Sequence, residues 1–208
     1  MEATVLIPAY NEEATIASVV RVAKEAGFPV VVADDGSKDR TAEEAAGAGA
    51  EVVRLERNRG KGGAIAEGLK RVKTPLVLLL DADLLGLKSE HLRALLLPVA
   101  RGEAEMTVGV FRGGRLSTDL AMRITPFLSG QRGLRTQDLR EVPGLEAARY
   151  DLELLLTQHA KKRGWRVLYL PLKGVSQVMK EEKRGLLRGL LHRLRMYKEI
   201  LRYRLKAR

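Results

Sequence analysis

Two aspartates at one-residue spacing end the most apolar segment of the chain. Residues 76–80 (Leu-Val-Leu-Leu-Leu) predict a strand buried on both faces, and Asp81 and Asp83 follow it directly. In an open α/β sheet the carboxyl ends of the strands form the binding crevice, and side chains two positions apart share one side of a strand. Convergent carboxylates favour a hard cation, Mg²⁺ or Mn²⁺, with positions left open for diphosphate oxygens. The alternative is a polar strand exit, and the long apolar run favours the metal.

Three further polar motifs fall at expected strand ends. Residues 8–12 (Pro-Ala-Tyr-Asn-Glu) follow the first expected strand, and residues 34–37 (Asp-Asp-Gly-Ser) follow the second. Adjacent carboxylates at such a place can accept hydrogen bonds from ribose hydroxyls and base N–H groups. Residues 58–63 (Asn-Arg-Gly-Lys-Gly-Gly) open an expected helix, whose backbone N–H groups and Lys61 can meet an anion. Each motif alone also fits an ordinary helix start or tight turn.

The elements that must position these motifs alternate between strand and helix. Strands are expected at 3–8, 30–33, 52–55, 76–80, 106–111 and 166–170, and helices after Asn11 and at 41–48, 60–72, 90–100, 150–162 and 184–206. Residues 112–140 form a polar, Gly- and Arg-rich stretch. The series predicts a doubly wound α/β fold with a mostly parallel sheet and helices on both faces.

Composition narrows the function classes. A chain of 208 residues, 45% of them hydrophobic, can bury one sizeable core. It has no cysteine, which excludes a thiolate nucleophile and a zinc-thiolate site. No apolar stretch approaches the roughly 20 residues of a membrane span, and no leader pattern follows Met1, so we expect a cytoplasmic protein.

Positive charge is concentrated in the second half of the chain. The net charge is +11, made of −2 over residues 1–100 and +13 over residues 101–208. Such a surface suits phosphate groups, an anionic membrane or nucleic acid. Few aromatic residues are present for base stacking and the expected crevice is acidic, so we expect no nucleic-acid partner.

The four motifs, in this order and spacing, resemble those of GT-A fold glycosyltransferases of family 2. The resemblance covers residues 4 to about 100 and implies transfer of a sugar from a nucleotide diphosphate sugar. It implies Asp83 as the main metal ligand, with Asp81 beside it. The nucleotide-sugar contacts that it implies are Pro8, Ala9, Tyr10, Glu12, Asp35, Lys61, Asp81 and Ala82.

Residues 128–135 (Leu-Ser-Gly-Gln-Arg-Gly-Leu-Arg) resemble the acceptor loop of polyprenyl-phosphate sugar synthases and glucosyl-3-phosphoglycerate synthases. Both use acceptors that carry phosphate, which a guanidinium group binds with two parallel hydrogen bonds. The alternative is a solvated basic loop. The acceptor contacts that the resemblance implies are Arg123, Ser129, Gly130, Arg132 and Arg135.

Two later residues bear on catalysis. Glu153 matches an acidic position near the sugar in the phosphoglycerate type, and a helix-surface charge is an equally good interpretation. With Asp83 and Arg132 it completes the expected catalytic set. Gln177 stands where phosphoglycerate-type enzymes place a metal-binding histidine; an amide oxygen can bind Mg²⁺ but replaces imidazole poorly for Mn²⁺.

We expect one catalytic domain over 1–178, with a nucleotide-sugar half (1–100) and an acceptor half (101–178), followed by a basic amphipathic helix over 179–208. Its leucine stripe beside basic residues suits an anionic membrane surface, or packing on the parent domain or on a second subunit in a homodimer. The alternative to a transferase is a nucleotide-binding or membrane-surface protein without transferase activity.

Overall fold

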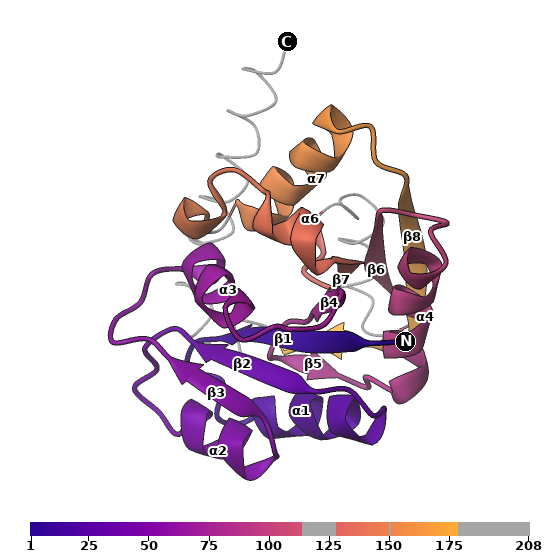
Figure 1. Ribbon diagram of the computed structural model, residues 1–208. Coiled ribbons are helices and arrows are strands. Elements are labelled where there is room, and N and C mark those ends of the chain that lie inside the picture. Colours follow the sequence, from indigo (N-terminus) through magenta and orange to yellow (C-terminus); the bar gives the residue numbers. More distant parts are fainter. Residues whose placement is uncertain (114–127, 150, 179–208) are drawn as a thin grey trace. The chain divides into compact units, whose positions relative to one another are not determined.

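The computed structural model describes residues 1–113, 128–149 and 151–178 (Figure 1). Contacts divide the chain into two units, Met1–Ser176 and Gln177–Arg208. The expected basic helix over 179–208 and the expected acceptor residue Arg123 lie outside the described residues.

A seven-stranded sheet forms the centre of the first unit, in the order β3-β2-β1-β4-β7-β6-β8. All neighbouring pairs are parallel except those of β7, which is antiparallel to β4 and to β6. A two-stranded sheet pairs β5 with β9. The strands are β1 (Ala3–Ala9), β2 (Val30–Asp34), β3 (Glu51–Arg54), β4 (Leu76–Leu79), β5 (Leu84–Leu85), β6 (Met106–Arg112), β7 (Arg132–Arg135), β8 (Val167–Lys173) and β9 (Ser176–Gln177).

Helices cover both faces of the sheet, with α1 and α2 on one side and α3, α6 and α7 on the other (Figure 1). They are α1 (Ile16–Glu25), α2 (Thr41–Gly47), α3 (Lys61–Leu69), α4 (Ser89–Ala100), α6 (Thr136–Arg140), the 3-10 helix η2 (Leu145–Ala147) and α7 (Leu152–Lys162). The predicted α/β fold with a mostly parallel sheet is confirmed.

Two apolar cores result from the alternation of side chains along the strands. In β1, Val5 and Ile7 pack in the core that contains α1 and α4, whereas Leu6 packs in the other, which contains α3 and α7. All three side chains have no exposed surface. Because β1 is buried on both faces, it and its parallel neighbours are firmly held, and their carboxyl ends form a rigid edge.

The structure differs from expectation in the polar stretch 112–140. Its residues Arg132–Arg135 form the central strand β7, and α6 follows at once. This strand lacks an apolar run, so periodicity did not reveal it. Gly133 is required there, because a Cβ atom would lie 2.6 Å from the Leu95 carbonyl oxygen of α4 and 2.7 Å from Thr107 Oγ1.

Candidate functional site

The carboxyl ends of three parallel strands bring the polar motifs together. The register of β1 and β2 pairs Ala9 with Asp34, and that of β1 and β4 pairs Leu6 with Leu79. The residues that follow these strands therefore emerge at one edge of the sheet, as expected for a ligand crevice.

Hydrogen bonds tie the loops after β1 and β2 into one unit. The Asn11 backbone N–H donates to Ser37 Oγ (2.9 Å), and Asn11 Oδ1 accepts from the Lys38 N–H (2.9 Å). The Glu12 N–H donates to Thr41 Oγ1 (2.8 Å). The helix expected after Asn11, α1, begins only at Ile16, and Asn11 itself has a φ of 56° and does not cap it. Its side chain joins two loops instead.

Asp35 fixes the start of the third motif. Its Oδ1 accepts a hydrogen bond from the Arg59 N–H (2.6 Å) and its Oδ2 from the Gly60 N–H (2.9 Å). Burial raises the pKa of this carboxyl above its ordinary value, while the two N–H groups act in the opposite direction. Asp35 thus holds the loop before α3 from the neighbouring strand. Its contact with a base or ribose stays a prediction.

An ionic cluster, which we call the Lys61 cluster, joins both halves of the chain. Lys61 Nζ lies 2.5 Å from Asp81 Oδ1 and 2.5 Å from Glu153 Oε1, and Gln131 Nε2 donates to Asp81 Oδ2 (2.7 Å). Burial favours neutral Lys61, but the two carboxylates outweigh it and raise the pKa of Lys61 above its ordinary value. Lys61 is therefore a cation held between two anions, and Glu153 belongs to the crevice.

The segment before β7 closes over this cluster. A Cβ atom on Gly130 would lie 2.5 Å from Asp81 Oδ1 and 2.7 Å from Lys61 Nζ, so only glycine fits there. Ser129 is fully buried, with Oγ 2.5 Å from the Gly109 carbonyl oxygen and 2.6 Å from Gln131 Oε1. Ser129 and Gly130 were expected in this region, but Gln131 was not, because the sequence alone gives an uncharged amide beside an arginine no distinct chemical role.

Arg132 requires a correction. It was expected on an exposed loop as a phosphate ligand, but its side chain has no exposed surface. Its Nε donates to the Ser129 carbonyl oxygen (3.0 Å), and its Nη2 donates to the Glu153 carbonyl oxygen (2.9 Å) and to Thr157 Oγ1 (3.1 Å). Burial lowers the pKa of Arg132 to about 10, which leaves it charged near neutrality. It holds the first turn of α7, which carries Glu153.

Arg135 was also expected to bind the acceptor, and its position contradicts this. The antiparallel register pairs Arg132 with Leu79 but Arg135 with Leu76, at the amino end of β4. Asp81 follows the opposite end of the same strand. Arg135 therefore lies at the edge of the sheet away from the Lys61 cluster.

The expected metal ligands follow β4 in a turn. β4 ends at Leu79 and β5 begins at Leu84, so the two aspartates lie outside the strands, and the alternation of side chains along a strand does not apply to them. Asp83 is 9% exposed. Among the described residues, no three His, Cys, Asp or Glu side chains form a ready metal group.

The donor set nevertheless fits a hard divalent cation that takes further oxygens from substrate. Asp81 and Asp83 offer carboxylate oxygens, the ligands that such a cation prefers. Gln177 belongs to the second unit, so its role as a ligand stays a prediction.

The remaining expected donor contacts lie at the ends of β1 and β4. Ala9 and Ala82 are buried, whereas Pro8, Tyr10 and Glu12 keep part of their surface exposed. Their contacts with a nucleotide stay predictions. None of the described helices is both long and apolar enough to cross a membrane.

A mostly parallel sheet with carboxylates and a lysine gathered beyond its strand ends defines an α/β protein of the GT-A type. The family model described as Glycosyl transferase family 2 matches residues 4–167. The chain belongs to this family, and the resemblance stated from the motifs is confirmed.

Curated relatives have related names. An undecaprenyl-phosphate 4-deoxy-4-formamido-L-arabinose transferase of Pseudomonas aeruginosa is 40% identical over 93 residues, which are 39% of this chain and 27% of the relative. The enzyme of the same name from Edwardsiella ictaluri is 35% identical over 141 residues, 61% of this chain and 42% of the relative. The matches thus span less than half the length of these relatives.

Solved structures of similar fold include glucosyl-3-phosphoglycerate synthase of Mycobacterium tuberculosis. The complex with Mn²⁺, UDP-glucose and phosphoglyceric acid matches with a TM-score of 0.71 and 27% identity, covering 85% of this chain and 71% of that chain. The complex with Mg²⁺ and UDP also matches with a TM-score of 0.71, at 26% identity, covering 92% and 79%.

Proposed function

We propose that this chain transfers a sugar from a nucleotide diphosphate sugar to an acceptor that carries phosphate, with Mg²⁺ or Mn²⁺ as cofactor. The Lys61 cluster carries the proposal. It joins Lys61 at the start of α3, Asp81 after β4 and Gln131 before β7 with Glu153 in the first turn of α7, so both halves of the chain contribute to one polar centre. A cluster built from distant segments beyond the strand ends of an α/β sheet is typical of a ligand site.

The residues have distinct proposed tasks at the donor. Asp83, with Asp81 and Gln177, would hold the divalent cation, which when bound neutralises charge on the leaving diphosphate. Pro8, Ala9, Tyr10, Glu12, Asp35 and Ala82 would border the nucleotide. Lys61 remains protonated between two carboxylates and can donate to an oxygen of the donor.

Glu153 would bind a hydroxyl group of the donor sugar or of the acceptor. Its Oε1 accepts from Lys61, and among the described residues no hydrogen bond reaches Oε2. That oxygen can accept a hydrogen bond from a sugar hydroxyl, or take a proton from an acceptor hydroxyl as general base. A phosphate monoester acceptor would need no base, because its oxygen is already anionic. Both acceptor chemistries are thus compatible with the site.

The choice of acceptor decides where the protein works. A polyprenyl phosphate requires the chain to reach an anionic membrane surface, and the basic residues of 179–208 suit this. A soluble acceptor, 3-phosphoglycerate, requires no membrane. We propose a cytoplasmic location for both, with peripheral membrane contact in the first.

A direct test is a panel of nucleotide sugars assayed for release of the nucleotide diphosphate, with Mg²⁺ or Mn²⁺ present. Each donor is offered with 3-phosphoglycerate or with a short polyprenyl phosphate. We expect acceptor-dependent release that Lys61→Ala abolishes and that Arg101→Gln, an exposed change after α4, leaves intact. Tight nucleotide binding with no turnover for any pair would favour the nucleotide-binding protein without transferase activity.

A further inference from the structure

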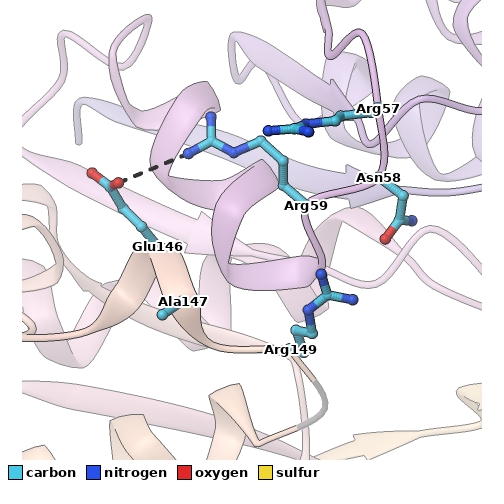
Figure 2. Close-up of a pocket in the computed structure, with 6 residues that line it drawn as sticks. All are labelled: Arg57, Asn58, Arg59, Glu146, Ala147 and Arg149. Atoms are coloured by element: carbon cyan, nitrogen blue, oxygen red, sulfur yellow. Dashed lines mark ion pairs between the residues drawn. The ribbon is translucent and has the colours of Figure 1, made fainter.

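A pocket of about 440 Å³ lies beside the start of α3 and carries an unusual concentration of arginine (Figure 2). The loop after β3 forms one wall, and the segment at and after η2 forms the other. Its lining residues are Arg57, Asn58, Arg59, Glu146, Ala147 and Arg149. We call it the arginine pocket. It belongs to neither the Lys61 cluster nor the expected acceptor loop.

The positive charge of this pocket is only partly balanced. Arg59 Nη1 lies 3.5 Å from Glu67, which also accepts from Lys70, and Arg59 Nη2 lies 3.8 Å from Glu146. In the described part of the chain, neither Arg57 nor Arg149 has a carboxylate within 4 Å of its guanidinium group. The lining therefore carries three guanidinium groups and one exposed carboxylate, and this excess of positive charge attracts an anion.

The walls of the pocket are held by the backbone. The N–H groups of Arg59 and Gly60 donate to the buried Asp35, and the Gly62 N–H donates to the Ala148 carbonyl oxygen (2.9 Å). Gly60 has a φ of 85°, and a Cβ atom there would lie 2.7 Å from Arg149 Cγ. The glycine thus allows the loop to approach Arg149 closely. The backbone that carries the three arginines is positioned before any ligand arrives.

We propose that the arginine pocket binds a phosphate or diphosphate group. The planar guanidinium group matches two phosphate oxygens at once, and the Asn58 amide adds a neutral donor. The ammonium group of Lys61, by contrast, is already engaged by two carboxylates. The pocket therefore offers the less occupied cations at this edge of the sheet. Its ligand is a small phosphorylated molecule, whether free phosphate or the phosphate of a donor or acceptor.

The test uses the full-length protein and inorganic pyrophosphate as the probe, with binding measured by isothermal titration calorimetry at two salt concentrations. We expect saturable binding that weakens with added salt and falls at least tenfold in Arg57→Gln and in Arg149→Gln. Glu146→Gln should instead tighten binding, because it removes the carboxylate that competes for Arg59. Arg101→Gln, an exposed arginine outside the pocket, is the matched control and should leave binding unchanged.

The outcomes separate the proposal from its rivals. Absence of binding, or binding that ignores both arginine substitutions, overturns it. Loss of binding with the control Arg101→Gln as well as with the pocket variants also overturns it, since only overall charge would then matter. If pyrophosphate binds in the arginine pocket, a competition experiment identifies the natural ligand. Displacement of pyrophosphate by UDP assigns the pocket to the donor, displacement by 3-phosphoglycerate assigns it to the acceptor, and displacement by neither defines a separate site. No turnover is needed, so the result stands apart from the transferase proposal.

Discussion

Replacing Arg132 by methionine tests the buried position of this guanidinium group. Methionine keeps much of the side-chain volume but removes the donors to Ser129, Glu153 and Thr157. The Glu153 carbonyl oxygen keeps a partner, because Thr157 Oγ1 also donates to it (2.8 Å). The main losses are the bond to the Ser129 carbonyl oxygen, which is left buried without this donor, and the bond to Thr157.

The magnitude follows from these losses. A buried acceptor left unsatisfied costs about 1–3 kcal/mol, and a hydrogen bond from a charged donor contributes about 1.5–3 kcal/mol. Part of this is offset because a buried cation is removed together with its desolvation cost. We expect Arg132→Met to lower the free energy of unfolding by about 2–4 kcal/mol. For a chain of this size that lowers the melting temperature by about 5–15 °C.

The assay is urea denaturation followed by circular dichroism, with Thr157→Val as a matched variant that removes only the hydroxyl. Thr157→Val should cost about 1–2 kcal/mol, less than Arg132→Met. An Arg132→Met protein with wild-type stability would refute the buried role, since exposed substitutions rarely change stability by more than about 0.5 kcal/mol. A raised acceptor KM together with wild-type stability would restore the original assignment of Arg132 as a phosphate ligand.

Three further changes test other parts of the structure. Asp83→Ala should abolish sugar transfer and leave the melting temperature within about 2 °C, because the Asp83 side chain belongs to neither apolar core; full activity with saturating metal would reject the ligand role. Gly130→Ala should reduce transfer at least tenfold while the protein stays folded by circular dichroism, because its Cβ atom meets Asp81 Oδ1 at 2.5 Å; normal turnover would mean that the segment relaxes freely. The pKa of Glu105 is lowered to about 2 by its hydrogen bonds from Arg166, so its contribution to stability is full above about pH 4.5 and is lost as the pH falls towards 2. Glu105→Gln should therefore flatten the acid limb of a stability–pH curve measured by urea denaturation, and an unchanged limb would assign the acid loss to other carboxylates.

Most strand and helix patterns along the first 100 residues were readable because their apolar runs are buried, β3 with its half-buried and exposed residues being the exception. β4, for example, was expected at 76–80 and is observed at Leu76–Leu79. The motif positions followed from the same logic, since parallel strands deliver their carboxyl ends to one edge. Glu153 could be linked to the crevice only as one of two interpretations, because nothing local distinguishes a site glutamate from a helix-surface glutamate.

The elements in the second half of the chain were harder to predict from the sequence, for a physical reason. β7 consists of Arg-Gly-Leu-Arg, and its strand conformation comes from pairing with β4 and β6 rather than from its own pattern. The sequence alone does not distinguish an arginine whose guanidinium group donates to buried carbonyl oxygens from an arginine that binds a phosphate group. Arg132 was therefore assigned to the acceptor. Gln131, which precedes it in the sequence and belongs to the Lys61 cluster, was missed.

The insertion of β7 between β4 and β6 has a consequence for how the chain folds during synthesis. Residues 1–100 contain four of the seven strands, but the outer edge of β4 can be paired only after residues 132–135 have emerged. Until then, β4 presents unpaired N–H and C=O groups along an apolar strand, the arrangement most prone to association between chains. We therefore expect that residues 1–100 do not fold autonomously. A fragment that ends near residue 100 should aggregate, whereas one that extends past β7 and β8 has the partners to close its sheet.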